Sequence, residues 1–152
     1  MKNNGMRYIS PVALFTIVFL VAINIHDSEA KMSMAQIKNM MKPVSKTCIT
    51  KIGVSKDLID KTHEGEFPPD PQLQCYYACI FKMMKVVTKD EQVDLNLILK
   101  QINMLALEEL GKQITPIVQD CDAKITATEV CEVSWAFAKC LWETDQSMYF
   151  FP

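Results

Sequence analysis

Apolar residues recur every three or four positions through most of the chain beyond residue 30, which is the spacing of one face of an α-helix. The pattern predicts about six helices, over residues 32–52, 56–63, 71–88, 94–106, 108–122 and 128–144. No run of useful length alternates apolar and polar residues in the manner of a β-strand. The sequence therefore predicts an all-α domain.

The helix expected over residues 71–88 is the one around which we expect the others to be arranged. Asp70 is a good N-cap, and Pro71 suits the first helical position. Apolar side chains follow on nearly every side of this helix, which is typical of a buried helix. Cys75 and Cys79 are one turn apart and share a face, so two half-cystines can tie this helix to two other segments.

Several residues are expected to set the ends of the other helices. Pro43 should kink the first helix or split it in two, and Gly53 should end it. Pro116 is expected to interrupt the fifth helix. Thr126 and Glu129 have the spacing of a capping box at the start of the sixth.

The beginning of the chain has the pattern of a targeting segment. A positively charged start precedes an apolar run over residues 12–25, and small residues follow up to Ala30. This order indicates a secretory signal peptide over residues 1–30, cleaved after Ala30, and a mature domain over residues 31–152. A retained anchor helix is the alternative. No second apolar run follows, so we expect no stable membrane insertion.

All six cysteines fall in the predicted mature domain: Cys48, Cys75, Cys79, Cys121, Cys131 and Cys140. An even number in a small secreted chain indicates three disulfides. Spacing leaves the fifteen possible pairings open, except that a bridge within one helical turn would strain the helix.

Charge and composition argue against several kinds of function. The 16 basic and 18 acidic residues nearly balance, and no arginine follows Arg7, so nucleic acid is not an expected partner. The mature domain has one histidine, His63, in what reads as a polar loop, and a serine or cysteine nucleophile usually needs such a base. We therefore predict no catalytic residues, no cofactor and no metal site.

Methionine and aromatic content favours a binding cavity. Eight of the ten methionines lie beyond residue 30, and methionine adapts to irregular space and varied partners. For any single methionine, simple packing in a solid core is the favoured explanation; the argument for a cavity rests on all of them together with the disulfides. The aromatic tail over residues 149–152 would be unfavourable in water, so we expect it to fold back as a wall of a pocket, or alternatively to dock in a surface groove.

The cysteine spacing C-x26-C-x3-C-x41-C-x9-C-x8-C is similar to the six-cysteine signature of insect odorant-binding proteins, the pheromone- and general-odorant-binding family. The x3 and x8 intervals are its specific part. Other segments also resemble the family: residues 51–54 after the first cysteine, residues 75–81 around the second and third, and residues 140–152 at the end.

The resemblance implies helices around an apolar cavity, and it implies the disulfides Cys48–Cys79, Cys75–Cys131 and Cys121–Cys140. It also implies a secreted, non-enzymatic carrier of small apolar volatile ligands such as odorants or pheromones. Such a carrier moves its ligand through aqueous sensillar fluid to a receptor, as a monomer or weak homodimer. Two alternatives stay open: the same scaffold carrying a non-olfactory lipid or hormone-like ligand, and a secreted helical signalling protein without a cavity.

Family pocket positions fall here on Tyr76, Leu95, Ile98, Ile102, Ile114, Ile117, Trp135, Phe137, Ala138, Leu141, Tyr149 and Phe150. Helical spacing adds Phe81 and Met84. Trp135 is equally compatible with plain core packing. Hydroxyl groups are expected to orient a polar head of the ligand, and the candidates are Tyr76, Tyr149, Thr115 and Ser134.

Some members of the family close the pocket through a pH-sensitive contact between the terminal carboxylate, a helical tyrosine and a basic residue shortly before the first cysteine. Tyr76 and Pro152 match two of these groups. Ser45 stands three residues before the first cysteine, with Lys42 and Lys46 flanking it. The departure predicts that any acid-triggered release is weak.

Overall fold

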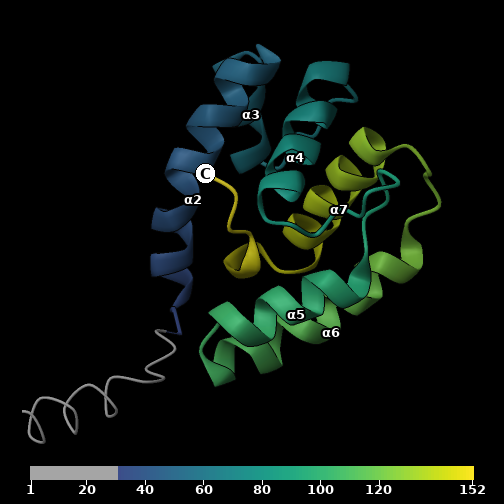
Figure 1. Ribbon diagram of the computed structural model, residues 1–152. Helices are drawn as coiled ribbons and strands as arrows, with labels where there is room; N and C mark the ends of the chain where they lie inside the picture. The colour runs from purple at the N-terminus through teal and green to yellow at the C-terminus, as the bar shows by residue number, and fades with distance from the viewer. Residues whose placement is uncertain (1–30) are drawn as a thin grey trace, which may run out of the picture. The chain divides into compact units, whose positions relative to one another are not determined.

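The computed structural model describes residues 31–152, and the predicted signal peptide over residues 1–30 lies outside the described residues. The described part is all-helical, as predicted (Figure 1). Its elements are α2 (Met34–Ile52), α3 (Lys56–His63), α4 (Pro71–Met83), α5 (Leu95–Leu105), α6 (Glu108–Lys124), α7 (Val130–Thr144) and the 3-10 turn η1 (Gln146–Met148). Within these residues the β pairing is limited to isolated bridges, between Met32 and Ala106 and between Val87 and Val93.

Local capping explains where α2 and α3 begin and end. Ser33 and Gln36 form a reciprocal capping box at the start of α2. Gly53 ends α2 with φ = 77°, in the left-handed region that a residue without a Cβ adopts freely, and its N–H donates to the Ile49 carbonyl. Ser55 then caps α3, which extends through His63, so this histidine belongs to a helix rather than to a loop.

The expected splits at proline do not occur, whereas the kink expected as the alternative at Pro43 stays a prediction. Pro43 lies inside one continuous α2, and Pro116 lies inside one continuous α6. Both prolines are exposed, so each lies on the solvent side of its helix. Buried residues before and after each proline hold the helix against the core, and packing outweighs the local preference.

The ends of two other helices also differ from the prediction. The helix predicted to reach residue 88 ends at Met83, because Lys85 takes φ = 59° and turns the chain. Val86 is nevertheless fully buried, so the apolar pattern continues after the helix has ended. The predicted capping box before the sixth helix does not form, since α7 begins at Val130 and Glu129 makes no side-chain cap.

Helix α4 is central, packed mainly on α7 and also on α2. Six consecutive residues of α4, 76–81, are buried, which confirms the prediction from its all-round apolar pattern. Helices α5 and α6 lie side by side as a hairpin, and the end of the chain runs back among the helices toward α2 (Figure 1).

The three disulfides confirm the implied pairing. Cys48–Cys79 joins α2 to α4, Cys75–Cys131 joins α4 to α7, and Cys121–Cys140 joins α6 to α7. The central helix is therefore tied on two sides.

Candidate ligand pocket

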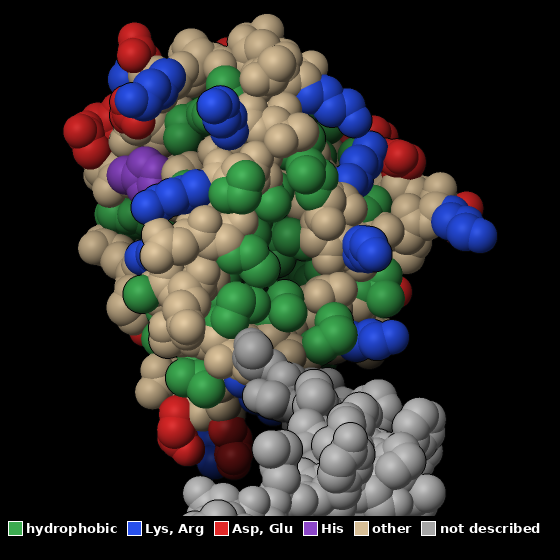
Figure 2. Space-filling view, turned by 60° about the vertical axis from the view of Figure 1, so that its left-hand side comes forward, with side chains coloured by type: hydrophobic (Ala, Val, Ile, Leu, Met, Phe, Trp, Pro, Cys, Tyr) green, Lys and Arg blue, Asp and Glu red, His purple; other side chains and the backbone are tan. Residues whose placement is uncertain are grey.

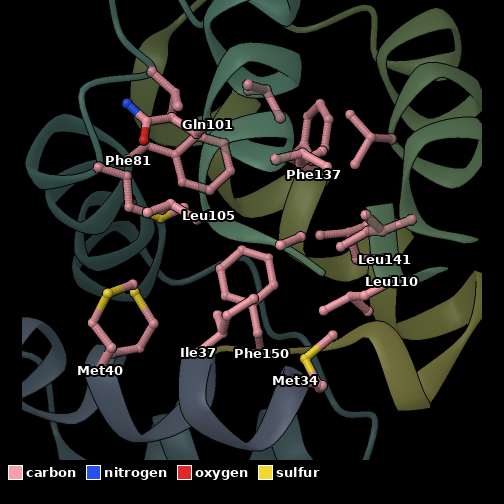
Figure 3. A pocket seen from close by; sticks show the side chains of 18 residues that line it. Met34, Ile37, Met40, Phe81, Gln101, Leu105, Leu110, Phe137, Leu141 and Phe150 are labelled. Atoms are coloured by element: carbon pink, nitrogen blue, oxygen red, sulfur yellow. The ribbon is translucent and has the colours of Figure 1, made fainter. Parts of the chain in front are cut away.

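An apolar pocket lies between α2, α4, α5, α6, α7 and the C-terminal tail (Figure 3). Every side chain that lines it is apolar except Gln101 on α5. Its free volume is small, about 70 Å³. Among residues 31–152 no cluster of His, Cys, Asp or Glu side chains has the makings of a metal site. The pocket therefore offers an apolar surface and hardly any polar chemistry.

The structure brings eight of the predicted pocket residues together at this place: Phe81, Met84, Ile98, Ile102, Ile114, Phe137, Leu141 and Phe150. They come from four helices, the segment after α4 and the tail. Their role as ligand contacts stays a prediction, but their shared location gives it a geometric basis.

Six predicted residues lie outside the lining: Tyr76, Leu95, Ile117, Trp135, Ala138 and Tyr149. Tyr76, Ala138 and Tyr149 are buried in the core, and the other three are partly buried and pack against that core. The resemblance to the family indicates on which helix a pocket residue lies, but not which way its side chain points. Rotation of a helix by a fraction of a turn moves a side chain from the pocket into the packed core.

The hydroxyls expected to orient a ligand head also lie outside the lining. The Ser134 hydroxyl donates to the Val130 carbonyl, and Tyr76 and Tyr149 are engaged with other side chains. Thr115 lines a separate, open hollow beside α6.

Sequence reasoning missed the whole contribution of α2 and several positions on α5 and α6. The missed lining residues are Met34, Ile37, Met40, Met41, Val86, Gln101, Leu105, Ala106, Leu110 and Val118. The signal for α2 was present in the sequence, because Met34, Ile37 and Met41 repeat at i, i+3 and i+7 on one helix face.

Methionine supplies much of the adaptable surface. Met34, Met40, Met41 and Met84 all line the pocket. A free volume of about 70 Å³ is below the roughly 150 Å³ of an engineered cavity that holds benzene. A larger ligand is accommodated only if lining side chains move, and unbranched methionine side chains change rotamer easily.

The pocket reaches the surface of the domain. Met40 lines it and is 37% exposed, and eight further lining residues are half-buried: Met34, Ile37, Met84, Gln101, Ile102, Leu105, Leu110 and Phe150. Figure 2 shows hydrophobic side chains gathered around a hollow on one face, with lysines around them.

The aromatic tail lies against the core. Phe150 lines the pocket and stacks on Phe151, with ring centroids 4.4 Å apart. Phe151 is buried and also meets the rings of Tyr77 and Phe81, at centroid distances of 5.2 and 6.0 Å. These contacts hold Phe150 beside the other lining residues.

A buried hydroxyl network fastens the tail to α3 and α4. The Tyr149 hydroxyl lies 2.7 Å from the Tyr77 hydroxyl and 3.1 Å from the Thr62 hydroxyl, which donates to the Ile59 carbonyl. Burial raises the pKa of Tyr149 to about 12, against opposing hydrogen bonds from Thr62 and Tyr77. Burial, together with the neighbouring Tyr149, also raises the pKa of Tyr77.

The network predicts a loss of stability at alkaline pH. An unfolded tyrosine ionises near pH 10, whereas Tyr149 in the folded chain ionises only near 12. The contribution of Tyr149 to the free energy of unfolding is therefore fully present below pH 10. It is lost as the pH rises toward 12, and the total loss is about 3 kcal/mol. Denaturant unfolding at stepped pH measures the loss, and Tyr149→Phe should reduce it. An unfolding free energy that stays flat up to pH 12 would contradict the assignment.

Ser45 occupies the place where the resemblance implied a basic residue. Its hydroxyl lies 2.8 Å from the Tyr76 hydroxyl, which donates to the Pro152 main-chain oxygen at 3.1 Å. Burial raises the pKa of Tyr76, against the hydrogen bond from Ser45. Neither side chain of this contact changes charge between neutral and mildly acidic pH, so weak acid-triggered release stays the prediction.

A helical domain held by three interlocked disulfides around an apolar pocket defines the class of small-ligand carriers to which insect odorant-binding proteins belong. A model of the PBP/GOBP family matches residues 30–144, and the chain belongs to this family. The family consists of odorant-binding carriers and not of enzymes.

Individual relatives agree with this assignment. General odorant-binding protein 69a of Drosophila melanogaster is 27% identical over 94 residues, which span 61% of this chain and 60% of that protein. The B1 protein of Tenebrio molitor is 26% identical over 67% of this chain and 75% of its own length. The structure of Apis mellifera odorant binding protein 5 superposes with a TM-score of 0.70 at 28% identity, covering 80% of this chain and 99% of that one.

Proposed function

We propose that this protein is a secreted carrier that binds small apolar volatile molecules in the pocket and moves them through aqueous fluid to a receptor. The observation that carries the proposal is the almost wholly apolar pocket, reaching the surface and backed by Phe150, within a PBP/GOBP domain. Residues 1–30 supply the signal for secretion, and residues 31–152 form the carrier domain. No helix of the described residues has the length and apolar character needed to span a bilayer.

The mechanism is transfer of an apolar molecule from water into an apolar site. Burial of a ten-carbon chain at ~0.8 kcal/mol per methylene supplies about 8 kcal/mol. This free energy corresponds to a dissociation constant of order micromolar, before ordering costs are subtracted. A pocket of this kind distinguishes ligands differing by one methylene only weakly, so we expect broad specificity.

Displacement of a fluorescent apolar probe tests the proposal. The refolded, oxidised mature domain is titrated with the probe and then with alcohols, aldehydes and esters of about six to fourteen carbons. Affinity should rise with chain length, because each buried methylene contributes ~0.8 kcal/mol. Saturable binding and competitive displacement at about micromolar concentration support a carrier. The absence of saturable probe binding would favour the alternative of a helical signalling protein with a filled core.

The small free volume of the pocket is the observation that favours the helical signalling protein. A core with only about 70 Å³ of free space is nearly fully packed. The four lining methionines are the counter-argument, because they make the pocket expandable. A carrier of a non-olfactory lipid or hormone-like ligand would give the same displacement curve, and detection of the protein in sensory tissue separates that case.

Phe150→Ala is expected to weaken binding of apolar ligands about tenfold, because the substitution removes an aromatic wall and with it roughly 1.4 kcal/mol of buried contact. Probe titration of the folded variant measures the change. Trp135→Ala is the matched control, since Trp135 is partly buried but lies outside the pocket lining. Unchanged affinity in Phe150→Ala would indicate a tail docked away from the ligand.

A further inference from the structure

Met40 is the lining residue of the pocket that is most accessible to solvent. It is 37% exposed, whereas all the other lining residues are buried or half-buried. Figure 3 shows Met40 extending from α2 at one edge of the group of lining side chains. Met40 is therefore in contact both with the pocket and with water.

The other methionines of residues 31–152 do not combine these two properties. The remaining lining methionines are half-buried or buried: Met34, Met41 and Met84. Met83 and Met104 are 45% and 42% exposed, but both lie outside the lining. A small oxidant dissolved in water therefore reaches Met40, Met83 and Met104 most easily, and of these three only Met40 lines the pocket.

We propose that Met40 is an oxidation site through which a hydroperoxide lowers the affinity of the pocket for its ligands. In the reaction with hydrogen peroxide, the sulfur lone pair attacks one peroxide oxygen and the O–O bond breaks. The departing hydroxide takes the proton of the new S–OH group and leaves as water. The thioether is thereby oxidised to the sulfoxide, and the peroxide is reduced.

The sulfoxide is polar, whereas the lining presents no polar surface to the pocket. A sulfoxide oxygen that points inward lacks a hydrogen-bond partner. If the oxygen turns outward to water, the pocket loses the thioether contact with the ligand. Either arrangement should weaken binding of an apolar ligand about tenfold. This inference rests on the proposed carrier function and adds a modification that regulates it.

Stepwise oxidation of the folded, disulfide-bonded mature domain tests the site. Hydrogen peroxide is added in increments, fragmentation mass spectrometry assigns each sulfoxide, and titration with the fluorescent apolar probe measures the affinity. We expect the affinity to fall about tenfold as Met40 sulfoxide accumulates. Saturating probe should slow oxidation of Met40 but not of Met83 or Met104, because a bound ligand covers only Met40. Unchanged affinity after complete conversion of Met40 would overturn the inference, and so would oxidation of Met40 at the same rate with and without probe.

Met40→Leu separates this site from general oxidative damage. Leucine nearly conserves the volume of methionine and has no sulfur, so the variant should fold and bind the probe. Peroxide still oxidises Met83 and Met104 in this variant, yet its affinity should persist. Met83→Leu is the matched control, and oxidation should lower its affinity as in the original chain. An equal loss of affinity in oxidised Met40→Leu would overturn the assignment of Met40. Failure of the unoxidised original chain to bind the probe would instead overturn the carrier function, so the two failures are distinguishable.

Discussion

Val118→Phe is expected to abolish binding of apolar ligands while leaving the domain folded. Val118 on α6 is 2% exposed and lines the pocket, so the added ring has only the free volume of about 70 Å³ to occupy. A ligand would then have to compete with a covalently attached side chain for the same space. We expect a loss of affinity of more than about 100-fold, equivalent to roughly 2.7 kcal/mol, in probe titration.

The effect on stability distinguishes filling of a pocket from damage to a core. A larger side chain in a fully packed core typically costs about 1–3 kcal/mol, but in an unfilled pocket the new contacts offset that strain. The unfolding free energy of Val118→Phe should therefore stay level or rise. Val133→Phe, at a half-buried position of α7 outside the lining, should bind the probe normally. Normal binding by Val118→Phe would show that ligands bind elsewhere.

The helical class and the order of the helices were predictable from the sequence because their causes are local. Ser55 caps α3, Asp70 caps α4, and Gly53 ends α2 with the conformation that glycine permits. The pairing of the cysteines was not predictable in this way, since spacing alone left nearly every combination open. It came from the resemblance to a family, and the structure agrees with it.

The errors arise where tertiary packing decides the outcome. Pro43 and Pro116 disfavour a helix locally, but both are exposed and their helices are held from the buried side. Val86 fits the apolar pattern of α4 and is buried, yet it follows the left-handed Lys85 and lies in the segment after the helix. The spacing of apolar residues in the sequence therefore predicts which residues face the core better than it predicts where a helix ends.

The pocket was predictable in kind but only partly in composition. Helical spacing placed Phe81 and Met84 correctly relative to the lining, whereas Tyr76 was expected there and instead lies in the core, hydrogen-bonded to Ser45 and the Pro152 main-chain oxygen. The lining from α2 was overlooked because its apolar face also reads as ordinary packing. Whether the apolar face of a helix packs against another helix or lines a pocket depends on the arrangement of all the helices. The sequence of a single helix does not determine that arrangement.

Replacement of both Cys75 and Cys131 by alanine is expected to cause the largest loss of stability of any change considered. The bridge closes a separation of 56 residues and joins α4 to α7, the helices that pack most extensively on each other. On the chain-entropy account, which is disputed, a loop of this length contributes about 4 kcal/mol by restricting the unfolded chain. That is a large share of the roughly 5–15 kcal/mol by which domains are typically stable.

Denaturant unfolding of the double variant measures the loss, with Cys121→Ala/Cys140→Ala as the comparison. That bridge closes 19 residues, for which the same account gives about 3 kcal/mol. Cys121 is fully buried, so its replacement by alanine also removes packing contacts in the core. Cys75 and Cys131 are half-buried, so the change in stability of their double variant reflects the entropy of loop closure more directly. A loss below about 1 kcal/mol for Cys75→Ala/Cys131→Ala would mean that helix packing alone holds α4 against α7. The pocket would then owe its shape to side-chain packing, and probe affinity should survive removal of the bridge.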